Sequence, residues 1–133
     1  MTDTMHQIGE VADTVGLSLR TIRYYDEVGI VVPSGRSPGG YRLYTDTDIE
    51  RLAFVKDLKP LDFSLDEIRD LLATIDALES PKTANAHTTE RLALFAALGE
   101  QRCEDLRAQL RAAERIVDAL RSRKAARRRT AQR

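Results

Sequence analysis

The chain has few of the residues that cross-link small proteins or bind metals. Its 133 residues include one cysteine, Cys103, and no tryptophan. A single thiol forms neither an internal disulfide nor a multi-thiolate metal site. The two histidines, His6 and His87, have no ligating side chains at a recurring metal-binding spacing. We therefore expect no bound metal and no cofactor.

Long apolar runs are also missing. The longest, Leu92–Leu98, is far shorter than the roughly 20 residues that a membrane-spanning helix needs. The segment Met1–Ile8 has neither the basic start nor the apolar stretch of a signal peptide. These absences predict a cytoplasmic protein with no membrane partner. The sequence also lacks a nucleophile–base set and a phosphate-binding glycine loop before a helix, so we expect no enzyme activity.

Charge is balanced overall but unevenly distributed. Residues 1–80 carry 8 basic and 15 acidic side chains, a net charge of −7, whereas residues 81–133 carry 13 basic and 6 acidic, a net charge of +7. Nucleic-acid contact in the acidic half must rest on a local basic patch, because phosphate affinity depends on the charges at the contact surface. Such a patch lies between Leu19 and Tyr44, and its basic residues are Arg20, Arg23, Arg36 and Arg42.

Two short helices are predicted near the N-terminus. The spacing of apolar residues over Ile8–Val15 predicts the first helix, and Gly16 ends it. Ser18 is a suitable N-cap for a second helix, from about Leu19 to Val28. Two helices joined by a short turn that contains glycine are typical of a helix-turn-helix.

A hairpin and two further helices follow. Two short β-prone runs, Val31–Val32 and Tyr41–Tyr44, flank a loop rich in glycine and proline, which predicts a β-hairpin, or wing. Thr45 caps a third predicted helix, and Pro60 ends it. The capping box Ser64–Glu67 opens a fourth helix.

The C-terminal part has the heptad pattern of a coiled coil. Apolar or small residues alternate spacings of four and three over four heptads. A single helix with such a seam cannot bury it alone, and a symmetric homodimer is the simplest arrangement. The expected dimer interface consists of Leu92, Ala96, Gly99, Cys103, Leu106, Leu110, Ala113, Val117 and Leu120.

Several motifs together resemble the MerR family of bacterial transcription regulators. They lie in the family's order and spacing: Ile8–Ala12, Thr21–Asp26, Gly29–Ile30, Gly40–Tyr44 and Phe63–Ile68. The resemblance covers about residues 6–78, and the heptad helix extends it to about residue 122. It implies a mainly α fold, in which a winged helix-turn-helix with a small β-hairpin wing precedes a second helix pair. A long C-terminal helix then pairs with a partner as an antiparallel coiled coil.

The same resemblance predicts the domain organisation and the function. We expect a DNA-binding domain at residues 5–78, a linker at 79–88, a dimerisation helix at 89–122 and a disordered basic tail at 123–133. The family implies a homodimer that binds palindromic double-stranded promoter DNA. It would act on RNA polymerase indirectly, by distorting an over-long promoter spacer. Alternatives are an architectural or excisionase-like DNA-bending protein and a coiled-coil adaptor.

The resemblance does not extend to an effector, so any small molecule that controls the protein stays unknown. Metal-sensing members have a cysteine at the start of the dimerisation helix, and the corresponding segment here, Asn85–Leu92, has none. Drug-sensing members have an additional ligand-binding domain, which we do not expect here. The family also has glycine at the position of Asp62, just before Phe63.

The expected DNA-binding residues lie on the second helix, on the wing and near the end of the third helix. Arginine can bind guanine edges bidentately, and threonine and tyrosine hydroxyls suit phosphates. Tyr24 and Tyr25 point roughly 100° apart on a helix, so one can face DNA while the other packs on the core. We expect Tyr44 to pack the wing onto the body. The candidate set is Arg20, Thr21, Arg23, Tyr24, Tyr25, Arg36, Tyr41, Arg42 and Lys59, with Lys56 as a weaker candidate.

Cys103 and the basic C-terminus each allow two interpretations. Cys103 lies in the seam, where a free cysteine is usually a small buried apolar residue. It is alternatively a redox switch, because it is one step from the seam midpoint Leu106. A disulfide between two copies requires Cα atoms within about 7 Å, and cytosolic reduction opposes it. The segment Arg121–Arg133 is a solvated end or a non-specific phosphate contact.

Overall fold

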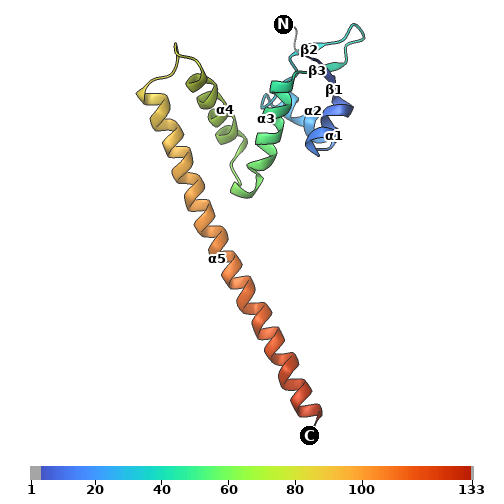
Figure 1. The fold of residues 1–133 in the computed structure, drawn as a ribbon, viewed down its shortest axis with the longest axis vertical. Coiled ribbons are helices and arrows are strands. Elements are labelled where there is room, and N and C mark those ends of the chain that lie inside the picture. The colour runs from blue at the N-terminus through green and yellow to red at the C-terminus, as the bar shows by residue number, and fades with distance from the viewer. Residues whose placement is uncertain (1–3, 133) are drawn as a thin grey trace. The chain divides into compact units, whose positions relative to one another are not determined.

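A computed structural model describes residues 4–132, which are mainly helical with one small sheet (Figure 1). The chain divides into two compact units between Leu92 and Ala93. The first unit, as far as it is described, contains a three-stranded sheet and the helices α1 to α4. The second consists of most of the long helix α5. The mainly α fold with a small wing, a second helix pair and a long C-terminal helix is confirmed.

Helix α1 (Ile8–Val15) ends where the sequence predicted. Its C-cap Gly16 has a φ of 78°, in the left-handed region that glycine adopts without strain. A Cβ at this position would lie 2.8 Å from Lys56 Nζ, the end of a flexible side chain that can move aside. Glycine at this turn is therefore required by the backbone conformation.

Helix α2 (Leu19–Glu27) is the second helix of the helix-turn-helix. The Ser18 hydroxyl accepts a hydrogen bond from Thr21 N at 3.1 Å, which confirms the predicted N-cap. Ile22 is fully buried and faces the core, so the opposite side of α2 is left for solvent or a ligand.

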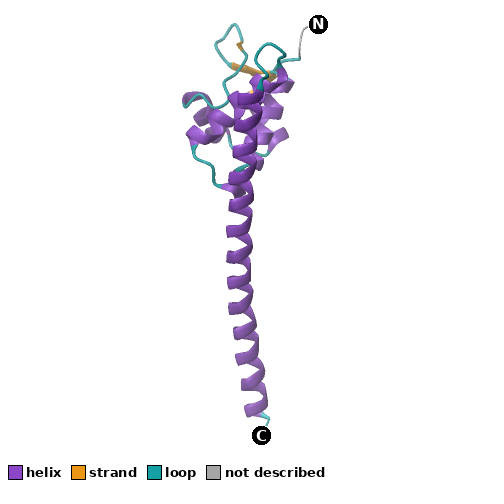
Figure 2. Ribbon diagram, turned by 90° about the vertical axis from the view of Figure 1, so that its left-hand side faces the viewer, coloured by secondary structure: helices purple, strands orange, loops and turns teal. Residues whose placement is uncertain are grey.

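The wing is part of a three-stranded antiparallel sheet. Strand β3 (Arg42–Tyr44) lies in the middle, between β1 (His6–Gln7) and β2 (Gly35–Arg36). Figure 2 shows these strands in orange as very short segments. At the tip, Gly40 has a φ of 82° and donates its N–H to Ser37 O, which closes the turn.

One expectation about the strands was wrong, and one strand was missed. Val31–Val32 is not a strand, because Ile30 N and Val31 N both donate to Tyr25 O and fold this segment against the end of α2. Val31 is buried there as a core residue. Strand β1 was not predicted, since two residues are too short for an alternating pattern.

Helices α3 (Asp46–Asp57) and α4 (Leu65–Glu79) form the second helix pair. Both begin with a reciprocal capping box, at Thr45 and at Ser64, as the sequence predicted. In the first box, the buried carboxylate of Asp48 accepts a hydrogen bond from Thr45 N. The same carboxylate accepts one from the Ser34 hydroxyl at 2.5 Å. The start of α3 thereby anchors the loop that leads into the wing.

The link between α3 and α4 differs from the expectation that Pro60 ends the third helix. Helix α3 stops earlier, at Asp57, and Pro60 lies in a 3-10 helix formed by Lys59–Leu61. Asp62 then has a φ of 53°, in the left-handed region. This geometry explains why glycine suits the position, and aspartate is among the residues that tolerate it best.

The core lies between the helix-turn-helix, the wing and the second helix pair. Its four largest fully buried side chains are Tyr44, Ile22, Leu52 and Val11. The burial of Tyr44 confirms that it packs the wing onto the body, and burial raises the pKa of its hydroxyl. Arg51 donates two hydrogen bonds, of 2.5 and 3.0 Å, to Asp76, so α3 and α4 are also joined by a bidentate ion pair.

Helix α5 (Ala86–Ala131) is a single helix of 46 residues, drawn without interruption in Figure 2. It begins after Asn85, whose side-chain oxygen accepts from Thr88 N at 3.0 Å. The helix is therefore longer at both ends than the predicted 89–122. Residues 123–131, expected to be disordered, continue the helix because arginine, lysine and alanine are strong helix formers. Arg133 lies outside the described residues.

Within residues 4–132, no helix has both the length and the apolar character required to cross a bilayer.

Candidate nucleic-acid interface

The exposed side of α2 presents the residues predicted to read DNA. Arg20, Arg23 and Tyr24 are exposed on α2, whereas Thr21 and Tyr25 are half-buried. The Thr21 hydroxyl accepts from the Ser18 hydroxyl at 2.9 Å, so it is engaged in the N-cap. This side of the helix therefore offers two guanidinium groups and one phenol to a ligand.

Tyr24 and Tyr25 differ in exposure, as their different directions on the helix require. Their ring centroids are 6.2 Å apart, and the planes are tilted by 47°. Tyr24 is exposed, while Tyr25 is half-buried and lines a groove with Phe63 and Ile68. Tyr24 is therefore the better placed of the two for contact with a ligand.

The wing adds a second set of exposed groups. Tyr41 is 71% exposed next to the glycine turn at its tip. A small hollow of about 150 Å³ is lined by Arg23 of α2 and by Gly40, Tyr41 and Arg42 of the wing. Helix α2 and the wing tip thus border one hollow.

Asp26 joins the wing to α2. Arg42 Nε donates to Asp26 Oδ2 at 2.8 Å, and Arg36 Nη2 lies 3.6 Å from the same oxygen. This hydrogen bond raises the pKa of Arg42. Asp26 is only 15% exposed, so the pair is partly shielded from solvent. Arg42, predicted as a DNA contact, is thereby held by an internal carboxylate.

The two candidate lysines near the end of α3 have different roles. Lys56 Nζ donates to Val15 O at 2.8 Å and so ties α3 to the end of α1. Lys59 is exposed at the start of the 3-10 helix. Both border a groove of about 390 Å³ that also includes Tyr24 and Thr21. Lys59 is therefore the better phosphate candidate.

Sequence reasoning missed an ion-pair cluster at the N-terminal edge of the sheet. His6 Nδ1 lies 3.0 Å from Glu10 Oε1, and His6 Nε2 lies 2.7 Å from Asp46 Oδ1. These hydrogen bonds, first to Asp46 and then to Glu10, raise the pKa of His6. The spacing of His6 and Glu10 was a usable signal, but the contact to Asp46 depends on the tertiary fold.

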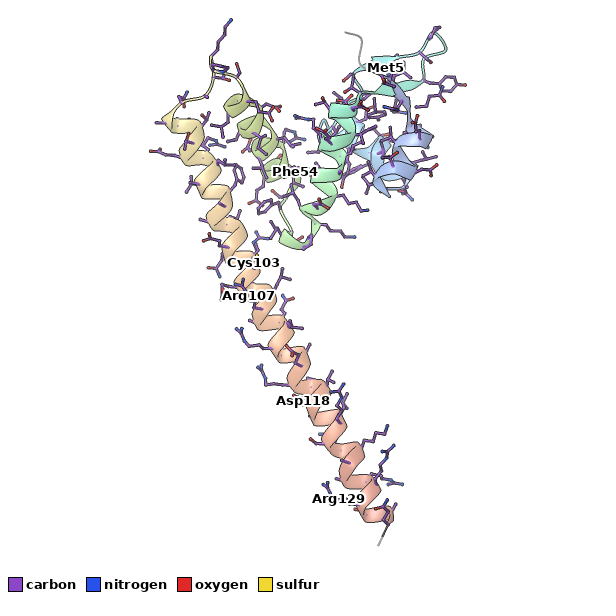
Figure 3. All side chains as sticks on the ribbon, viewed as in Figure 1. Met5, Phe54, Cys103, Arg107, Asp118 and Arg129 are labelled. Atoms are coloured by element: carbon purple, nitrogen blue, oxygen red, sulfur yellow. The ribbon has the colours of Figure 1, made fainter. Side chains whose placement is uncertain are left out.

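The predicted dimer positions all lie on α5, where no described residue is fully buried. Cys103, labelled in Figure 3, is a free and half-exposed thiol in this helix. Among residues 4–132, no cluster of three or more His, Cys, Asp or Glu side chains is arranged to hold a metal ion.

Two sequence profiles match most of this architecture. Residues 7–75 match the profile described as "MerR HTH family regulatory protein", and residues 49–123 match "MerR, DNA binding". The chain belongs to the MerR family. Its family core thus covers the helix-turn-helix, the wing, the second helix pair and most of α5.

Curated MerR-family proteins are similar over the N-terminal half. The chain is 40% identical over 74 residues to the mercuric resistance operon regulatory protein of Bacillus cereus. The matched region covers 56% of each protein. It is 42% identical over 69 residues to the regulator ZntR of Escherichia coli, covering 52% of this chain and 49% of ZntR. The matched region of this chain therefore spans about half the length of these relatives.

Solved MerR-family structures match more of the chain. A MerR-family regulator from Bacillus cereus has a TM-score of 0.62 at 29% identity, covering 88% of this chain and 75% of that one. HiNmlR, described as lacking the sensor domain and solved bound to promoter DNA, has a TM-score of 0.62 at 26% identity. That match covers 92% of this chain and 89% of HiNmlR.

Proposed function

We propose that this chain is a transcription regulator that binds a palindromic promoter sequence as a homodimer. The observation that supports this best is that Arg20, Arg23 and Tyr24 are exposed on α2, and that Arg23 lines one hollow together with the exposed Tyr41 of the wing. Exposed arginines on a helix that follows a tight turn are suited to base edges in the major groove. The glycine-rich wing tip suits close approach to the phosphate backbone.

The binding residues divide into two roles. Arg20 and Arg23 read base edges, while Tyr24, Tyr41 and Lys59 contact the backbone. Arg42 and Arg36 also contact phosphate, once the DNA has replaced Asp26 as their anionic partner. Thr21 and Tyr25 support the surface from its partly buried side.

Binding is tested by fluorescence anisotropy with DNA from upstream of the chain's own gene. Arg20→Ala and Arg23→Ala should each weaken binding to the palindrome about 10- to 100-fold, the usual cost of a lost bidentate base contact. Lys82→Ala, which removes an exposed cation from the loop between α4 and α5, is the matched control. Equal effects of all three substitutions would contradict base reading by α2.

For the mode of action, we propose activation by distortion of an over-long promoter spacer, so that RNA polymerase engages both of its elements. Deforming DNA costs several kcal/mol, which the dimer's contacts on two half-sites must offset. In vitro transcription tests this with the natural promoter and with a spacer shortened to the optimal length. The regulator should activate the first and not the second. Binding at many scattered sites without an effect on transcription would instead indicate an architectural DNA-bending protein.

A further inference from the structure

Helix α5 leaves a stripe of apolar side chains exposed. Leu110 and Leu120 are 60% and 57% exposed, and Leu106 and Val117 are also exposed. A helix that displays such a stripe at heptad spacing normally buries it against another helix. The pattern of side chains along the stripe restricts how that second helix can lie.

We propose that α5 pairs with α5 of a second copy in one antiparallel register, in which Cys103 lies opposite the partner's Leu106. This inference rests on the proposed homodimer, and it adds which residues meet across the interface. The seam positions alternate between the a and d positions of the heptad. In an antiparallel coil, each layer pairs an a position of one helix with a d position of the other. The layers are Cys103 with Leu106, Gly99 with Leu110, Ala96 with Ala113, and Leu92 with Val117.

The charges that flank the seam favour this register. Glu100 lies next to the partner's Arg107, and the two-fold symmetry forms this pair twice. A shift of one heptad would instead place Arg107 against the partner's Arg107 and Glu100 against the partner's Glu114. Parallel pairing would bring Arg102 towards the partner's Arg107. A shift of one heptad in the opposite direction would place Glu100 against the partner's Glu100. Among these arrangements, only the proposed register therefore avoids like charges beside the seam.

The ends of α5 support the same register. After Leu120 the seam positions continue as Lys124 and Arg127, which cannot be buried between apolar side chains. In the proposed register the partner helix, which begins at Ala86, ends opposite residue 123. The seam thus becomes cationic where the partner helix stops. In the register shifted by one heptad, Lys124 would face the partner's Leu92.

Charge reversal tests the pairing of Glu100 with Arg107. Figure 3 labels Arg107 on α5. Arg107→Glu and Glu100→Arg should each weaken the full-length dimer about tenfold, because two attractive pairs become repulsive. The double variant Glu100→Arg with Arg107→Glu should restore the dissociation constant to within about threefold of the original. Sedimentation equilibrium measures all three.

Arg107 also forms an ion pair with Glu104 of its own helix, so this contact needs its own control. Glu104→Gln removes the intrahelical pair and should leave the dimer unchanged. Two additive losses in the double variant, with no restoration, would overturn the proposed register.

A short bis-maleimide provides an independent geometric test. With a rise of about 1.5 Å per residue, the two Cys103 residues lie about 4.5 Å apart along the coil axis in the proposed register. Two cysteines at position 110 would lie about 16.5 Å apart along it. The native chain should therefore cross-link to a covalent dimer, and Cys103→Ser/Leu110→Cys should not.

Two other arrangements give a different cross-linking result. The shift of one heptad in the opposite direction is tested by the charge reversal instead, because it places Glu100 against the partner's Glu100. Cross-linking at position 110 but not at Cys103 would indicate the shifted register, and cross-linking at both would indicate parallel helices. Either outcome overturns the inference while leaving the homodimer intact. A native chain that sediments as a monomer at all concentrations would contradict the homodimer itself. Far-ultraviolet circular dichroism of each variant confirms that it is folded.

Discussion

The helix-turn-helix unit and helix α5 differ in what their side chains contact. In the first unit, Val11, Ile22 and Leu52 are fully buried by residues distant in the sequence. In α5, no described residue is fully buried. The first unit therefore contains its own core, while the apolar groups of α5 stay exposed in the single chain.

The ion pairs differ in the same way. The first unit has pairs that join separate elements, such as Arg42 with Asp26 and Arg51 with Asp76, beside a local pair within α4, Arg69 with Asp66. In the second unit, Arg107 with Glu104 joins neighbouring turns of one helix. Long-range contacts thus specify a tertiary fold in one unit, and local propensity specifies a helix in the other.

The largest effect is expected from a charge placed in the α5 seam. Leu106→Asp would bury two carboxylates per dimer, at a cost of about 2–3 kcal/mol each, so association should weaken more than about 1000-fold. Sedimentation equilibrium measures this. Ala108→Asp places the same charge on the outer side of the helix and should leave the dimer intact.

The same pair of variants sharpens the comparison between the units. All four tyrosines, at positions 24, 25, 41 and 44, lie in the first unit. Tyrosine fluorescence should therefore show an unchanged unfolding transition in Leu106→Asp, while the helical signal at 222 nm decreases. A joint loss of both signals would mean that the first unit has no independent stability.

A cavity in the first unit should have the opposite effect. Leu52 is fully buried on α3, and Leu52→Ala should lower the free energy of unfolding by about 2–5 kcal/mol. Urea denaturation followed by tyrosine fluorescence measures this loss. The dimer dissociation constant at low urea should stay the same. A large change in dimerisation would show that the core of the first unit controls α5.

A smaller loss is expected at the turn of the helix-turn-helix. Gly16→Ala places a Cβ on a left-handed residue with a φ of 78°, so it should cost about 1–2 kcal/mol, while the flexible end of Lys56 can move away from the added Cβ. Gly9→Ala, within α1 and with nothing near its added Cβ, should be neutral or stabilising. Equal melting temperatures of the two variants would contradict the strain argument.

The smallest effect concerns the ion pairs of His6. Because Asp46 and Glu10 raise the pKa of His6 above its usual 6.5, the folded state binds the proton more tightly than the unfolded chain. The resulting stability is full below pH 6.5 and is lost as pH rises through the higher folded-state pKa. His6→Gln should lower the melting temperature by about 2 °C at pH 6 and leave it unchanged at pH 9. His87→Gln is the control, and a pH-independent difference for His6→Gln would contradict this account.

Local signals predicted most of the helix boundaries. Gly16, Ser18, Thr45 and Ser64 each act on backbone groups within a few residues, so their effect can be inferred from the sequence alone. The family resemblance added the order of elements. The end of α5 was predicted too early, because the loss of apolar seam positions was taken as the end of the helix.

Contacts between distant residues could not be predicted in this way. The strand at His6–Gln7 exists only because β3 is beside it. Lys56 lies 41 positions from Val15, whose carbonyl it binds, and local periodicity contains no sign of that contact. The basic patch between Leu19 and Tyr44 stays a prediction as a DNA-binding surface, and the pairing of Arg42 with Asp26 within it depends on the wing folding back onto α2.

The carboxylate of Asp26 offers Arg42 the same chemistry as a phosphate, two oxygens that share a negative charge. Any polyanion that recruits Arg42 must displace this internal competitor and leave a largely shielded carboxylate without its cation. Because that exchange would cost the same for every nucleic acid, it would weaken binding to the operator and to the rest of the genome by the same factor. The ion pair therefore lowers the overall affinity for polyanions and leaves the choice between sequences to the base contacts.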